Sequence, residues 1–123
     1  MNRRHEILVV DDDVEIREML QMALADEGYD VLCASDGAAA LALLDQHSPS
    51  VILLDMRMPV MDGWAFARAY AARPGPHAPI LVMTAAVDAA RWAREVGASA
   101  SVPKPFDLNR LIEAVAEHAG AEV

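Results

Sequence analysis

Val51-Ile52-Leu53-Leu54-Asp55 is a run of four apolar residues that ends in an aspartate, a pattern typical of a buried β-strand. Three similar runs are also followed by polar residues: residues 7–10 by Asp11-Asp12-Asp13, residues 80–83 by Thr84, and residues 99–103 by Lys104. In an open parallel sheet, ligands bind outside the carboxyl ends of the strands. We therefore expect these four segments to converge on one crevice.

Strand-like runs alternate along the chain with amphipathic helical patterns. Five such units are present, which predicts an α/β fold with helices around a parallel sheet. The first and last helical segments each place apolar residues on one face. The residues expected to face the core are Ile16, Met19, Leu20, Ala23 and Leu24 in the first segment, and Leu108, Leu111, Ile112, Val115 and Ala119 in the last.

Aspartates and glycines mark the predicted helix ends. Asp88 and Asp107 occupy positions typical of N-caps. Gly28 and Gly97 occupy positions typical of left-handed helix stops, just before the next strand-like segment.

Composition and charge restrict the functional classes. The length of 123 residues, 54% of them apolar, fits a single domain over residues 1–123 with a buried core. The net charge of −9 argues against direct nucleic-acid binding, because phosphate contacts need clustered Lys and Arg. Cys33 is the only cysteine, so no disulfide framework is expected. No run is long enough to span a membrane, and the basic start Met1-Asn2-Arg3-Arg4 lacks a signal-peptide core, so we expect a cytoplasmic location.

Asp11, Asp12 and Asp55 would bring two or three carboxylates into the predicted crevice. The free protein would relieve their repulsion by protonating one of them or by binding a cation. Oxygen ligands at a partly open site suit Mg²⁺. Asp11 and Asp12 alone could instead be helix caps, since Asp12 and Glu15 have the spacing of a capping box. Asp55 favours the metal site, because it lies in a different unit at the same sheet edge.

A carboxylate beside a bound cation can act as a nucleophile. Asp55 could attack a phosphorus centre and form an acyl phosphate. Phosphoryl transfer depends mainly on positioning and charge stabilisation, so a cation and a hydroxyl are needed near the transferred group. Lys104 and Thr84 would supply them. A lone Lys is usually solvated and a lone Thr after a strand usually forms a turn, but their predicted place beside Asp55 favours a role in the site.

Four motifs resemble the receiver domain of two-component response regulators: Val9-Val10-Asp11-Asp12, Leu54-Asp55-Met56-Arg57-Met58-Pro59-Val60-Met61-Asp62-Gly63, Thr84-Ala85 and Lys104-Pro105-Phe106. Their order matches the family, and the resemblance covers essentially the whole chain. It implies a flavodoxin-like (βα)5 three-layer sandwich with a parallel five-stranded sheet in the order 2-1-3-4-5.

The resemblance implies that Asp55 accepts a phosphoryl group from the phosphohistidine of a sensor histidine kinase or phosphotransfer protein. Mg²⁺, for which Mn²⁺ could substitute, would be held by Asp12, Asp55 and the backbone carbonyl of Arg57. Asp11 would act mainly through water. The Lys104-Pro105 peptide would be cis and would aim Lys104 into the site.

The same resemblance implies a switch of protein–protein interactions rather than a metabolic enzyme. The chain would catalyse its own phosphorylation from the donor and its own slow hydrolysis. The first helix and the loop around Pro105-Phe106 would face the kinase. The fourth and fifth helices would face an output protein or domain outside this chain, and a phosphorylation-dependent dimer is compatible with this. No contact with nucleic acid or a membrane is expected.

Ser101 and Arg57 are individual features of this chain. Receivers commonly place Tyr or Phe three residues before the lysine, where the ring moves inward with the threonine; here that residue is Ser101. A small hydroxyl cannot fill a cavity as an aromatic ring does. We therefore expect activation that is weaker or takes another route, or output that runs through backbone shifts alone. Arg57 could shield the acyl phosphate, pair with an acidic residue of a partner, or be solvated.

The two tryptophans leave alternatives open. Trp92, on the fourth helical segment, could be an exposed interface anchor on the output face or could be partly buried against the neighbouring helix. Trp64 begins the helix after Asp62-Gly63, so we expect local packing near the site and a fluorescence response to Mg²⁺.

Two other functional classes share an acidic pocket. A Mg²⁺-dependent phosphohydrolase with an aspartyl-phosphate intermediate would usually place a second Asp two residues after its nucleophile, where this chain has Arg57. The chain also lacks a cap or lid large enough to enclose a substrate. A phosphorylation-independent receiver-like binding module would keep the pocket without using it, and persistent output in Asp55→Asn would favour that class.

Overall fold

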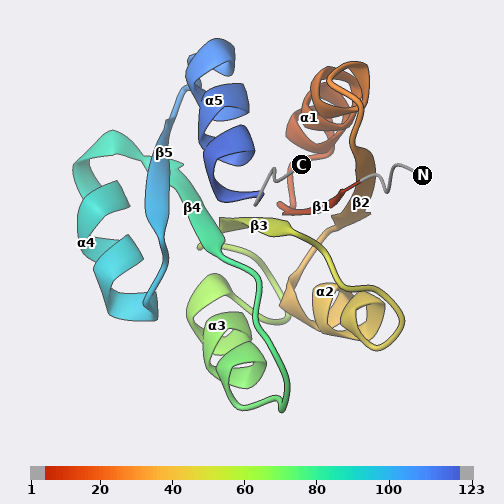
Figure 1. Ribbon diagram of the computed structural model, residues 1–123. Coiled ribbons are helices and arrows are strands. Elements are labelled where there is room, and N and C mark those ends of the chain that lie inside the picture. The colour runs from red at the N-terminus through yellow and green to blue at the C-terminus, as the bar shows by residue number, and fades with distance from the viewer. Residues whose placement is uncertain (1–4, 120–123) are drawn as a thin grey trace.

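The computed structural model describes residues 5–119, and within them one parallel five-stranded sheet lies between two layers of helices (Figure 1). The strand order is β2-β1-β3-β4-β5, so the predicted α/β class and strand order are confirmed. The strands are β1 (Glu6–Val10), β2 (Asp30–Ala34), β3 (Val51–Asp55), β4 (Ile80–Ala85) and β5 (Ala100–Lys104). The basic start of the chain, Met1-Asn2-Arg3-Arg4, lies outside the described residues.

Five helices cover the two faces of the sheet. They are α1 (Val14–Asp26), α2 (Gly37–Leu44), α3 (Gly63–Ala71), α4 (Ala86–Val96) and α5 (Leu108–His118). Helices α1 and α5 lie on one face, and α2, α3 and α4 lie on the other (Figure 1). None of the described helices is long and apolar enough to cross a bilayer.

The central strands are buried on both faces. In β1, Leu8 and Val10 point into the core under α2, α3 and α4, while Ile7 and Val9 point into the core under α1 and α5. All four side chains are inaccessible to solvent. This double burial explains why the strands are continuous apolar runs rather than alternating ones.

The predicted apolar faces of the outer helices are largely confirmed. Leu20 and Leu24 of α1 are buried, as are Leu111 and Val115 of α5. Met19 was expected in the core and is instead 41% exposed. It lies on the flank of α1 that turns toward the loop after β5, where it lines a groove with Phe106.

Aspartate side chains cap α1, α2, α3 and α5. These caps are Asp13, Asp36, Asp62 and Asp107, and each accepts hydrogen bonds from backbone N–H groups of the first turn. The prediction for Asp107 is therefore confirmed. The capping-box alternative for Asp12 is wrong, because Asp13 accepts the hydrogen bond from the Glu15 N–H at 2.9 Å.

Helix α4 differs from the other four at its N-terminus. It follows β4 directly at Ala85 and has no side-chain cap. The predicted cap at Asp88 is wrong, because Asp88 lies within the first turn and pairs with Arg91 at 2.8 Å. Gly97 ends the helix in the left-handed conformation with φ of 71°, as predicted. Gly28 also has positive φ, 98°, one residue after the C-cap of α1.

Candidate functional site

The parallel sheet brings the four predicted segments to one edge. Asp55 is the last residue of β3, Lys104 is the last residue of β5, and Asp11 directly follows β1. Thr84 lies near the end of β4, opposite Pro103 in the register with β5. In the register between β3 and β4, Asp55 pairs with Met83, which is the residue before Thr84. The convergence of the four segments expected from the sequence is therefore confirmed.

Three carboxylates cluster at this edge of the sheet. Oxygen atoms of Asp11, Asp12 and Asp55 lie within 4.8 Å of one another. Asp11 is fully buried and Asp55 is 7% exposed, whereas Asp12 is exposed to solvent. The cluster therefore offers oxygen ligands at a site that is open on the Asp12 side.

Lys104 lies between two of the acids. Its Nζ is 2.9 Å from Asp11 Oδ2 and 3.6 Å from Asp55 Oδ1. The Lys104-Pro105 peptide bond is cis, as the family resemblance implied. Thr84 is 7% exposed, so its position differs from that of a solvated turn residue.

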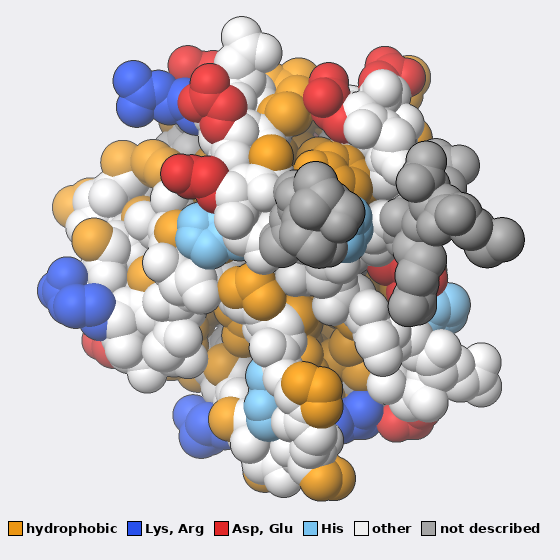
Figure 2. All heavy atoms as spheres, in the orientation of Figure 1, with side chains coloured by type: hydrophobic (Ala, Val, Ile, Leu, Met, Phe, Trp, Pro, Cys, Tyr) orange, Lys and Arg blue, Asp and Glu red, His pale blue; other side chains and the backbone are white. Residues whose placement is uncertain are grey.

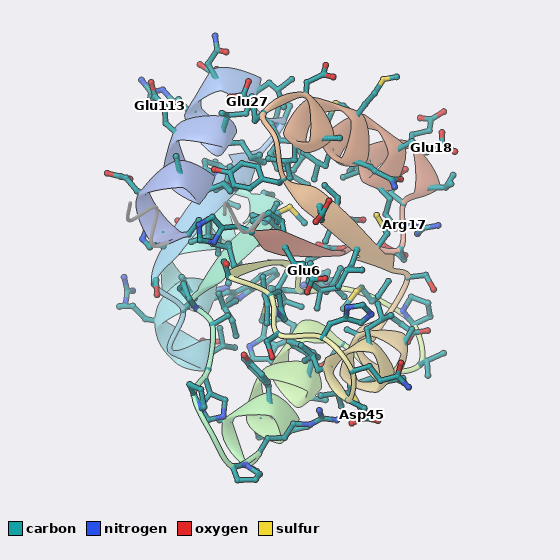
Figure 3. All side chains as sticks on the ribbon, turned by 45° about the vertical axis from the view of Figure 1, so that its right-hand side comes forward. Glu6, Arg17, Glu18, Glu27, Asp45 and Glu113 are labelled. Atoms are coloured by element: carbon teal, nitrogen blue, oxygen red, sulfur yellow. The ribbon has the colours of Figure 1, made fainter. Side chains whose placement is uncertain are left out.

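Asp11 is held by contacts on each side. Its Oδ1 accepts a hydrogen bond from the Asp13 N–H at 2.9 Å, and its Oδ2 accepts the one from Lys104. Its backbone oxygen accepts a hydrogen bond at 2.8 Å from Nη1 of Arg17, which is labelled on α1 in Figure 3. Since both Asp11 oxygens are engaged, Asp12 and Asp55 have the freer carboxylates.

The surroundings change the proton affinities of the central pair. Burial, reinforced by the Asp11 carboxylate, raises the pKa of Asp55 from 3.8 to about 6, although the Lys104 ammonium opposes the shift. For Lys104, burial lowers the pKa, but the hydrogen bond and charge of Asp11 together with Asp55 outweigh it and raise the pKa above 10.5. Lys104 is therefore a cation at neutral pH, and Asp55 loses its proton around pH 6 rather than around pH 4.

The β3–α3 loop, which follows Asp55, is held by two backbone hydrogen bonds. Gly63 N donates to the Met56 carbonyl at 2.9 Å, and Gly37 N donates to the Met61 carbonyl at 3.0 Å. A Cβ on Gly63 would lie 2.8 Å from Met56 Cα. Val60 has a φ of 68° and is 85% exposed. These constraints are not apparent from the sequence, because they depend on how the loop folds back rather than on any local pattern.

Arg57 lies against α4. Its Cζ is 5.1 Å from the centroid of the Trp92 ring, and Trp92 packs edge-on against Trp64 with centroids 4.8 Å apart. Trp64 Nε1 donates to Glu95 Oε1 at 2.9 Å. Trp64 thus packs locally, as expected. The interpretation of Trp92 as an exposed anchor on the output face is wrong, because the ring is 6% exposed and fills the space between α3 and α4.

Ser101 is a half-buried residue of β5, which forms one edge of the sheet. It pairs with Val82 in the register between β4 and β5. Its position therefore agrees with the expected strand, while its part in switching stays a prediction.

Lys and Arg side chains are scattered in the view of Figure 2 and do not gather into a patch on that face.

A groove of about 310 Å³ opens beside Lys104, lined by Ile16, Met19, Lys104, Pro105, Phe106 and Leu108. This mainly apolar groove joins α1 to the loop after β5, the two segments expected to face a kinase.

Comparison with known proteins gives one consistent result. Residues 7–116 match the family described as "Response regulator receiver domain". The chain is 40% identical over 115 residues to the DNA-binding transcriptional regulator NtrC of Escherichia coli, covering 92% of this chain and 24% of NtrC. It is 41% identical over 108 residues to the response regulator MprA of a Mycobacterium species, covering 86% of this chain and 46% of MprA. The chain thus spans from about a quarter to half the length of these relatives.

A solved structure of similar length supports the same assignment. The chemotaxis response regulator CheY4 of Vibrio cholerae superposes with a TM-score of 0.85 at 33% identity. The match covers 94% of this chain and 98% of CheY4.

Proposed function

The chain belongs to the response regulator receiver domain family, the phosphoacceptor domains of two-component signalling, and from this premise we propose that Asp55 is its phosphoacceptor. The donor would be a phosphohistidine of a sensor histidine kinase or phosphotransfer protein. The main support is the placement of the Asp55 carboxylate beside Asp11, Asp12 and Lys104 at the carboxyl edge of the sheet. Residues 1–123 would act as a single receiver domain.

The donor set fits a small, hard cation. The three clustered carboxylates supply only oxygen ligands, and Asp12 leaves the cluster open to solvent. Asp12, Asp55 and the backbone carbonyl of Arg57 would hold Mg²⁺ or Mn²⁺, with Asp11 acting mainly through water. When bound, such an ion neutralises the acids and orients phosphoryl oxygens.

The side chains around Asp55 would divide the remaining work. An ionised Asp55 oxygen attacks the phosphorus, forming the acyl phosphate while the donor imidazole leaves. The Lys104 ammonium, already 3.6 Å from Asp55, would bind a phosphoryl oxygen. The hydroxyl of the buried Thr84 would donate a hydrogen bond to a second phosphoryl oxygen. These same groups would support self-catalysed phosphorylation and slow hydrolysis.

Partners would approach on different sides of the site. The groove between α1 and Phe106 would receive the phosphohistidine domain, since it opens beside Lys104. Helices α4 and α5 would present the output surface to a protein or domain outside this chain, or to a second phosphorylated copy. The family membership supports a cytoplasmic site of action.

Phosphotransfer from a labelled phosphohistidine domain tests this proposal. Transfer to the wild type and its loss in Asp55→Asn and Lys104→Ala is the expected result. Release of inorganic phosphate from small phosphate esters, with no stable phosphoprotein, would favour the phosphohydrolase class instead. Unchanged output activity in Asp55→Asn would favour a phosphorylation-independent module.

A further inference from the structure

Helix α4 is the one helix of residues 5–119 whose N-terminus has no side-chain cap. The other four helices have an aspartate cap, whereas α4 starts at Ala86 directly after β4 with no side-chain cap. A missing cap leaves backbone N–H groups of the first turn without a side-chain partner. This uncapped end follows Thr84 and Ala85, so it lies at the phosphoacceptor edge of the sheet.

Trp92 fixes α4 from the side. Its ring is 6% exposed and contacts the Trp64 ring of α3. Trp64 in turn donates to Glu95 of α4 at 2.9 Å, so Trp64 contacts α4 through both its ring and its Nε1. The Arg57 guanidinium lies 5.1 Å from the Trp92 centroid, within the usual range for a cation–π interaction.

Arg57 connects this cluster to the phosphoacceptor. It lies two residues after Asp55 in the β3–α3 loop, with only the fully buried Met56 between them. The loop is held on its other side by the hydrogen bond from Gly37 N to the Met61 carbonyl. Arg57 therefore links the loop that follows the phosphoacceptor to α4 through its contact with the Trp92 ring.

Phosphorylation would give Arg57 a competing partner. A phosphoryl group on Asp55 adds negative charge and strong acceptor oxygens close to the Arg57 backbone. Guanidinium–phosphate hydrogen bonds are stronger than an exposed cation–π contact. The guanidinium would then leave the Trp92 ring.

We propose that Arg57 and Trp92 form a latch that holds α4 in the unphosphorylated protein and opens when Asp55 is phosphorylated. The opening part of this proposal rests on the proposed function. The latch supplies a route from the site to α4 that does not use the Ser101 position. Arg57 is thus a positioning residue, acting on α4 through the Trp92 ring.

Arg91 provides a matched control. Its Cζ lies 5.9 Å from the same Trp92 centroid, but it belongs to α4 itself and pairs with Asp88. Removing Arg91 therefore takes a cation from the ring without cutting the connection to the loop. Arg57→Lys keeps a cation in the loop and should restore much of the latch.

Amide hydrogen exchange of residues 86–96 measures the latch before and after treatment with acetyl phosphate and Mg²⁺. In the resting proteins, we expect several-fold faster exchange in Arg57→Ala than in the wild type, Arg57→Lys or Arg91→Ala. Phosphorylation should bring the wild type close to Arg57→Ala. Tryptophan fluorescence gives a parallel readout, because both tryptophans of the chain lie in this cluster.

Equal exchange in resting wild type and resting Arg57→Ala would overturn the latch. Slow exchange in a fully phosphorylated wild type, verified by intact mass, would overturn its opening. If neither acetyl phosphate nor a phosphohistidine domain adds a phosphoryl group, the proposed function fails, and the resting comparison still decides whether the latch exists.

Discussion

At the scale of single residues, Asp55 combines function with a cost in stability. Burial raises its pKa to about 6, so its ionised form is disfavoured in the folded state. At low pH the carboxyl is protonated in both folded and unfolded chains, and no penalty arises. As pH rises from about 4 to about 6, the unfolded chain loses the proton first, so folding stability falls.

Asp55→Asn should therefore stabilise the metal-free protein at neutral pH. We expect the variant to exceed the wild type by on the order of 2 kcal/mol above pH 7, with the difference disappearing near pH 4. Urea unfolding in the presence of a chelator, repeated across this pH range, measures the difference. A difference independent of pH would contradict the charge argument.

Val60 is a strained residue at the surface. Its positive φ of 68° is unfavourable for a β-branched side chain, and its 85% exposure means that little burial compensates. Val60→Gly should stabilise the protein by about 0.5–1 kcal/mol. Val87, 87% exposed in α4, is the control: Val87→Gly should instead destabilise by a few tenths of a kcal/mol. Thermal unfolding that gives both variants the same sign would refute this explanation.

The principal site residues could be predicted because each lies at or directly after the carboxyl end of its own strand. The positions of Asp11, Asp55, Thr84 and Lys104 depend only on where strands end. The burial of Trp92 could not be predicted in this way. Helical periodicity identifies a face, but the contact of Trp92 with Trp64 depends on how α3 and α4 lie relative to each other.

At the scale of elements, the β3–α3 loop depends on a glycine with ordinary φ. A Cβ at Gly63 would lie 2.8 Å from Met56 Cα and 2.9 Å from the Asp55 carbonyl oxygen, so backbone must move. Gly63→Ala should lower stability by more than about 1 kcal/mol and slow the phosphorylation of Asp55. Gly37→Ala is the comparison, because there only a side-chain atom, Met61 Cγ at 2.7 Å, would lie closer than 3.0 Å, while the nearest backbone atom, the Met61 carbonyl oxygen, would lie at 3.0 Å. Phosphorylation as fast in Gly63→Ala as in Gly37→Ala would contradict the proposed role of the loop.

The start of α4 shows where local rules fail. Asp88 has the chemistry of an N-cap, but β4 runs directly into the helix, so the cap position falls to Ala85. Ala85 still pairs with Lys104 of β5, and a local sequence pattern does not contain such a long-range contact. The other predicted cap, Asp107, follows a true loop and was correctly identified.

At the scale of the whole molecule, the apolar runs determine the layers. Strands buried on both faces require helices on both sides, and the alternating units supply them. The strand order came from the family resemblance and is confirmed. The two hydrophobic cores lie on opposite faces of β1, β3 and β4. The acidic edge is therefore formed at the ends of the most buried strands of the protein.

Cation binding should stabilise the entire fold. A ligand that binds only the folded state adds about 2.7 kcal/mol when its concentration is about 100-fold above Kd. We expect Mg²⁺ to raise the Tm of the wild type, and Asp12→Asn to weaken that response. Asp88→Asn, which changes an acid outside the cluster, should respond as the wild type does. Equal Mg²⁺ responses in all three proteins would exclude the cluster as the binding site.

Intact-protein mass spectrometry after incubation with acetyl phosphate tests the central claim most directly. The wild type should gain one phosphoryl group in the presence of Mg²⁺ and none when the cation is chelated. Asp55→Asn should gain none under either condition. Addition that persists in Asp55→Asn, or that is indifferent to Mg²⁺, would contradict the assignment of Asp55 as a cation-dependent phosphoacceptor.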